Sequence, residues 1–137
     1  MALRQHLLEV HKLLACVPWV VFFSRRLPPA FRSRSCQGKG WKTAFPCARK
    51  QEIREFLTVF VKVFAFSDQE KLKFSPDDQI LHIYRALYPS KWLPDALELE
   101  TLATEIASRY GLKLETVWTA DLTLGQLFGH VQNAHRP

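Results

Sequence analysis

The segment Asp95–Gly111, DALELETLATEIASRYG, carries the clearest helix pattern in this chain of 137 residues. Asp95 can cap the first turn, and Glu98, three residues on, can reach back to the amide of the cap. Gly111 is suited to the left-handed turn that commonly ends a helix. Between these ends, apolar residues recur at spacings of three and four: Leu99, Leu102, Ala103, Ile106 and Tyr110. The stretch therefore predicts an amphipathic helix whose apolar face packs on other helices.

Two more helices are predicted upstream. Residues 51–66 place apolar side chains on a wide helical face, which indicates burial on more than one side. The members of this face are Ile53, Phe56, Leu57, Phe60, Val61 and Phe64. A second helix is predicted to begin at Ser75, with Pro76 at its first position, and to stop before Pro89.

A fourth helix is predicted to begin at Thr123, whose hydroxyl can pair with Gln126 in a capping box. Residues 133–137 are predicted to be a tail without fixed structure. Four helices and no credible strand pattern predict an all-α fold, a small four-helix bundle spanning residues 51–132.

The charge is distributed unevenly along the chain. Residues 1–50 hold ten Lys and Arg and one acid, whereas residues 51–137 hold nine Lys and Arg and twelve acids. This contrast predicts a basic, Pro/Arg/Ser-rich N-terminal extension on a mildly acidic domain. The extension could tether the protein to nucleic acid, or to an anionic membrane surface with Trp19, Phe22 and Phe23 as anchors. Alternatively it is poorly ordered and has no partner, or the natural chain starts downstream of it.

Cysteine and histidine positions do not predict a disulfide framework or a metal centre. The three cysteines are an odd number, so we expect a reducing, cytoplasmic location. The candidate metal ligands show no C-x₂-C or H-x₃-H pair, and we expect no metal site. These candidates are His6, His11, Cys16, Cys36 and Cys47. The apolar run 13–23 is eleven residues long, well short of the roughly 20 that span a bilayer.

No enzyme signature is present in the sequence. The chain lacks a Gly-rich phosphate loop, a G-x-S-x-G elbow and an H-E-x-x-H pair. His82 and His130 lie among apolar residues on predicted helices, where histidine is more often packed or exposed than a general base. We therefore expect no catalytic residue and no enzymatic activity.

Three motifs resemble the acyl carrier protein family. They are the helix start at residues 94–102 (PDALELETL), the Tyr110-Gly111-Leu112 turn, and the helix start at residues 122–127 (LTLGQL). The family opens its second helix with Asp-Ser-Leu, and its last helix begins with a Thr-(Val/Leu)-x-(Asp/Gln)-Leu pattern. The resemblance covers about 80 residues and implies the carrier fold.

The resemblance also implies a cofactor, but the position that would hold it has no serine in this chain. In the family, the serine carries 4′-phosphopantetheine through a phosphodiester, but the matching position here is Ala96. Ser90 and Thr101 lie in contexts unlike that of the family's serine. We therefore expect no bound cofactor.

The family's second helix docks on basic patches of partner enzymes through exposed acids. The residues that this comparison assigns to docking are Asp95, Leu97, Glu98, Glu100 and Glu105. The resulting hypothesis is a non-catalytic, carrier-like binding module for partner enzymes of fatty-acid, polyketide or related lipid metabolism. Two alternatives stay open: a functional carrier modified at an atypical residue such as Ser90, and an adaptor that binds anionic membrane or nucleic acid through residues 1–50.

Overall fold

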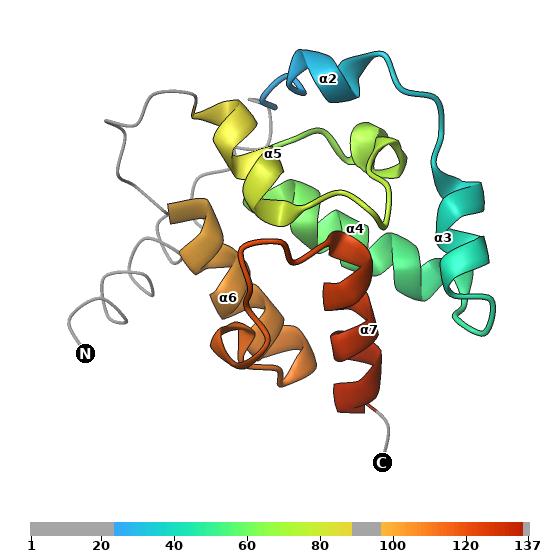
Figure 1. The fold of residues 1–137 in the computed structure, drawn as a ribbon, viewed down its shortest axis with the longest axis vertical. Helices are drawn as coiled ribbons and strands as arrows, with labels where there is room; N and C mark the ends of the chain where they lie inside the picture. The colour runs from blue at the N-terminus through green and yellow to red at the C-terminus, as the bar shows by residue number, and fades with distance from the viewer. Residues whose placement is uncertain (1–23, 89–96, 136–137) are drawn as a thin grey trace.

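The computed structural model describes residues 24–88 and 97–135, which form helices joined by turns and loops (Figure 1). Within these ranges there is no β-strand, only two isolated backbone bridges. The elements in order are α2 (Pro29–Arg32), α3 (Gly38–Ala44), α4 (Lys50–Val63), the 3₁₀ helix η2 (Asp68–Lys73), α5 (Ile80–Leu87), α6 (Leu97–Tyr110), the 3₁₀ helix η3 (Leu114–Thr116) and α7 (Leu124–His135). The all-α prediction is confirmed for the described residues. None of their helices is both long and apolar enough to cross a membrane.

Helix α4 is the centre of the core, as its wide apolar face predicted. Its buried residues are Ile53, Phe56, Leu57, Val59, Phe60 and Val61. All of these except Val59 pack with side chains from α5, α6 and α7 in one continuous cluster. The helix starts with a capping arrangement, because the Glu52 carboxylate accepts hydrogen bonds from the Arg49 backbone amide (3.3 Å) and guanidinium (3.0 and 3.1 Å). The bond from the Arg49 amide satisfies one of the backbone N–H groups that have no partner within the helix.

Residues 24–50 belong to the same folded unit, so the expected boundary at residue 50 is not a boundary in the structure. Leu27, Phe31 and Trp41 are buried in the cluster around α4. Trp41 is 1% exposed, and its indole N–H donates to the Phe74 carbonyl oxygen at 2.8 Å. The sequence pattern missed this segment because α2 and α3 are four and seven residues long, too short to show a helical period. Single large side chains hold them instead.

The second predicted helix begins later than expected. Residues 75–78 form a turn, in which the Asp78 carboxylate accepts hydrogen bonds from the Ser75 amide (2.7 Å) and from Arg34 (2.6 Å). Helix α5 then starts at Ile80. Capping residues at 75–78 thus close a turn before the helix, which explains why the sequence placed its start too early.

The start of α7 is locked against that turn. The Gly125 amide donates to the Pro76 carbonyl at 2.8 Å, and the Leu124 amide donates to the Asp78 carbonyl at 2.9 Å. A Cβ at Gly125 would lie 2.8 Å from both the Cβ and the carbonyl oxygen of Pro76, so only glycine fits at this crossing.

The predicted ends of α6 and α7 are confirmed in part. Gly111 has a φ of 69°, the left-handed turn expected after α6. The Thr123 amide donates to the Gln126 side-chain carbonyl at 3.0 Å, and the Gln126 amide donates to the Thr123 hydroxyl oxygen at 3.1 Å, which completes the capping box. The predicted tail is wrong for residues 133–135, because α7 continues to His135.

Replacing Ala65 with glycine should stabilise the fold. Ala65 follows α4 with a φ of 59°, and the Phe66 amide donates back to the Val61 carbonyl at 2.8 Å, the pattern of a Schellman turn. An alanine in this left-handed conformation is strained, so Ala65→Gly should raise the free energy of unfolding by about 0.5–1 kcal/mol. Urea unfolding followed by circular dichroism measures the change. Ala107→Gly, at an exposed position inside α6, is the control and should shift stability the opposite way; equal midpoints for Ala65→Gly and the natural chain would contradict the assignment.

Candidate functional site

Among the predicted docking residues that the structure describes, only Leu97 at the start of α6 is exposed. Leu97, the first residue of α6, is 43% exposed and is the one exposed large hydrophobic side chain among residues 24–88 and 97–135. Asp95 and Ala96, which the carrier motif places just before it, lie outside the described residues. The described part of this site is therefore an apolar side chain at the exposed beginning of a long helix.

Glu98 does not lie on the exposed face where the sequence placed it. It is 9% exposed, and its Oε1 accepts hydrogen bonds from the Tyr88 hydroxyl and from the Arg25 guanidinium at 3.4 Å. The other oxygen, Oε2, is buried and has no hydrogen-bond partner. Because a buried carboxylate needs compensating partners, Glu98 acts here as an internal tie between α6, the end of α5 and the segment before α2. The expectation that Glu98 is an exposed docking acid is wrong.

The ring of Tyr88 lies within the same tie. The Arg25 guanidinium carbon is 5.5 Å from the centre of this ring, close enough for a cation–π contact. Burial raises the pKa of the Tyr88 hydroxyl, and the adjacent Glu98 carboxylate raises that pKa further. The hydroxyl therefore stays protonated and donates to Glu98. Sequence reasoning missed Arg25 and Tyr88 because Arg25 lies 73 residues from Glu98 and no local motif joins them.

The remaining acids of α6 form a weaker charged face than the sequence predicted. Glu105 is only 15% exposed in its side chain and pairs with Arg109 on its own helix, with 3.0 Å between Nε and Oε2. Glu100, three residues after Leu97 on the same helix, is half-buried. The hydroxyl of Thr101 donates to the Leu97 carbonyl at 2.7 Å, so it is held against its own helix.

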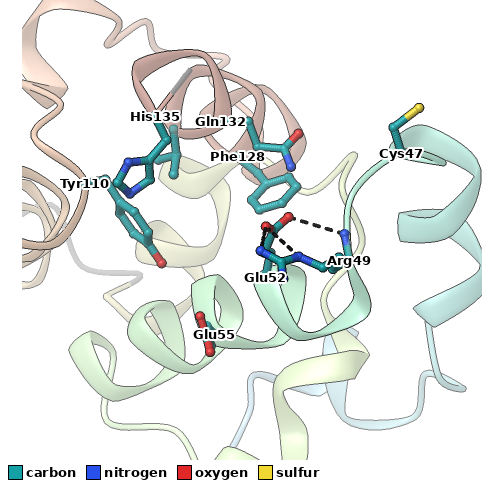
Figure 2. A pocket seen from close by; sticks show the side chains of 9 residues that line it. Cys47, Arg49, Glu52, Glu55, Tyr110, Phe128, Gln132 and His135 are labelled. Carbon is teal, nitrogen blue, oxygen red and sulfur yellow. Dashed lines mark hydrogen bonds and ion pairs between the residues drawn. The ribbon is translucent and has the colours of Figure 1, made fainter. Parts of the chain in front are cut away.

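A groove of about 540 Å³ lies away from the start of α6, between the beginning of α4 and the ends of α6 and α7 (Figure 2). Tyr110 and His135 face each other edge to face, with 5.9 Å between ring centres. The residues that line the groove are Cys47, Arg49, Glu52, Glu55, Tyr110, Phe128, Val131, Gln132 and His135. The polar groups at its centre are largely committed to one another, because Glu52 accepts three bonds from Arg49.

The titrating groups of the groove reflect these contacts. Hydrogen bonds from Arg49 lower the pKa of Glu52, which keeps this carboxylate charged. Burial raises the pKa of Tyr110. Cys47 and His135 lie on opposite sides of the groove in Figure 2, and the thiol is not aimed at the imidazole. The groove therefore offers no paired nucleophile and base.

Among the described residues, the histidines and cysteines that could act as metal ligands or bases do not gather at one site. His82 is exposed on α5 and packs edge-on against the Phe31 ring at 6.5 Å, while His130 is half-buried on α7. Cys36 and Cys47 are exposed thiols. In the part of the chain that the structure describes, no three His, Cys, Asp or Glu side chains gather in a way that could hold a metal ion. His6, His11 and Cys16 lie outside that part.

Comparisons with protein-family models, with curated proteins and with solved structures give no match for this chain.

Proposed function

We propose that this protein is a non-catalytic, acyl-carrier-like binding module that lacks its own phosphopantetheine arm and docks on a partner protein through the start of α6. The observation that carries the proposal is the exposure of Leu97. A single exposed leucine is common on protein surfaces. This one occupies the position that matches the leucine of the carrier motif, directly after the residue that replaces the family's serine.

The arrangement of the helices supports a carrier-like unit made of α4, α5, α6 and α7. The motifs that resemble the family fall at structural junctions: α6 ends in the left-handed Gly111, the short η3 follows, and α7 starts at the Thr123–Gln126 capping box. Helices α4, α6 and α7 contribute to one core. Short motifs that coincide with helix ends in the expected order are more informative than the same motifs scattered over loops.

The docking chemistry that fits this site is more apolar than the acidic face expected from the sequence. Glu98 and Glu105 are withdrawn into ion pairs, which leaves Leu97 with the half-buried Glu100 one turn further on. A leucine next to a carboxylate suits a partner that presents an apolar pocket with a cation at its rim. We assign such partners to enzymes or carriers that handle acyl chains.

A photo-crosslinking amino acid at position 97 tests the proposal. We expect a light-dependent adduct with an acyl-handling enzyme or carrier when Leu97→p-benzoylphenylalanine is expressed in the native host. The same amino acid at Ser108, exposed in the last turn of α6, is the matched control and should give no such adduct. Equal adducts from both positions, or adducts only with proteins that do not handle acyl chains, would contradict the proposal that Leu97 contacts such a partner.

A further inference from the structure

One stretch of the folded chain, residues 24–54, carries a high density of positive charge. Residues 24–54 contain nine Lys and Arg side chains and one carboxylate, Glu52. Residues 97–135, in contrast, contain two Lys and Arg side chains and five carboxylates. The positive charge is therefore concentrated in the segment that runs through α2 and α3 to the beginning of α4, and Figure 1 shows α2 and α3 following one another along one side of the fold.

Most of these cations have no carboxylate to neutralise them. Three of them form ion pairs, with Asp78 (Arg34, 2.6 Å), Glu52 (Arg49, 3.0 Å) and Glu98 (Arg25, 3.4 Å). The other six are exposed and form no ion pair with any residue in 24–88 or 97–135: Arg26, Arg32, Lys39, Lys42, Lys50 and Arg54. We call these six residues the basic face. Of the six, Arg32 donates one guanidinium N–H to the Leu27 carbonyl at 3.0 Å.

The basic face is fixed in place by the core beneath it. Phe31 lies next to Arg32 in the chain and is buried against Phe74, with 5.5 Å between the ring centres. Trp41, which lies between Lys39 and Lys42 in the sequence, is buried, and its indole N–H donates a hydrogen bond to the Phe74 carbonyl. The cations therefore project from folded helices, and a partner does not have to order this backbone when it binds.

We propose that the basic face binds the phosphate backbone of double-stranded nucleic acid without sequence preference. A duplex presents regularly repeated negative charges, which suits a series of cations spread over three helical elements. The aromatic residues of this segment are covered, since Trp41 and Phe31 are 1% and 3% exposed and the half-buried Phe45 packs on Trp41 and Phe128. They leave no exposed ring to stack on unpaired bases, so the contacts are to phosphates.

A membrane surface fits the described face less well. Stable attachment of a peripheral protein to lipid requires apolar side chains that enter the acyl boundary in addition to cations. The one exposed large hydrophobic residue of the described ranges is Leu97, which lies on α6 and not on the basic face. The inference is independent of the proposed docking function, because it uses different elements and residues.

Fluorescence anisotropy with a short fluorescein-labelled DNA duplex tests the inference. The full chain should bind, and the logarithm of its binding constant should fall linearly with the logarithm of the salt concentration. Lys39→Gln/Lys42→Gln/Lys50→Gln should weaken binding to duplexes of unrelated sequence equally and reduce the salt slope by about 3, roughly one for each phosphate contact removed. Vesicles of phosphatidylserine and phosphatidylcholine serve as the competing anionic surface.

A matched variant separates the basic face from net charge. Lys62→Gln/Arg85→Gln/Lys113→Gln removes the same number of charges at exposed positions outside the face, and it should leave the salt slope unchanged. Equal losses in the two triple variants would overturn the proposal, because binding would then follow total charge. Binding to the vesicles but not to the duplex, or no duplex binding at low salt, would overturn it as well.

Discussion

The variant Ala96→Ser should become a substrate for phosphopantetheine transfer, whereas the natural chain should not. The substitution restores a hydroxyl at the position that matches the family's serine, between Asp95 and Leu97, which match their family counterparts. After incubation with coenzyme A and a broad-specificity transferase, we expect Ala96→Ser to gain the mass of one phosphopantetheinyl group on most molecules. Intact-protein mass spectrometry measures the gain.

The position of the new serine provides the control for this result. Leu97→Ser places a hydroxyl one residue further on, at an exposed side chain whose loss leaves the core intact. This variant should gain no mass, because the attachment atom is displaced along the helix. If Ala96→Ser and Leu97→Ser both stay unmodified, the match between residues 94–102 and the carrier motif is wrong. A modified natural chain would show that another residue carries the group.

Trp41→Ala should destabilise the whole domain, although Trp41 lies in the segment that looks like an extension in the sequence. Its ring packs edge to face against Phe56 and Phe128, with ring centres 6.3 and 5.9 Å away. Truncating a buried tryptophan costs about 3–5 kcal/mol, and the loss of the indole N–H leaves the buried Phe74 carbonyl without this donor. Such a loss is a large fraction of the roughly 5–15 kcal/mol that stabilises an ordinary domain.

Urea unfolding of Trp41→Ala, followed by circular dichroism of the helices, measures this effect. Lys42→Ala changes the exposed neighbour on α3 and should shift the midpoint little. Trp41→Phe keeps an aromatic ring but removes the hydrogen bond, so it should fall between the two. An unchanged midpoint for Trp41→Ala would mean that residues 24–50 do not fold cooperatively with α4–α7.

The long helices could be predicted because their signals are local. In α4 the apolar residues recur at helical spacing, and at α7 the Thr123–Gln126 box is complete within four residues. Both patterns need only the neighbouring residues to be read. The same reasoning failed for α2 and α3, whose positions depend on contacts such as Trp41 with Phe74, 33 residues apart.

The candidate site was harder to predict than the fold, for the same physical reason. The spacing of Glu98 and Glu105 correctly indicates one face of a helix, but it does not say whether that face is exposed. Their exposure depends on where Arg25, Tyr88 and Arg109 lie, and two of these three come from other segments. Leu97, by contrast, was assigned to docking from the motif alone, and the structure places it at the surface.

Mass spectrometry of the protein isolated from its native host tests the central claim, a carrier-like module without an arm, most directly. Trypsin cleaves after Arg85, Lys91 and Arg109, so Ser90 and the carrier motif fall into different peptides: residues 86–91 contain Ser90, and residues 92–109 contain Ala96 and Thr101. The account predicts an intact protein without a phosphopantetheinyl group and both peptides at their unmodified masses. A phosphopantetheinyl group on either peptide would contradict the account and make the protein a working carrier.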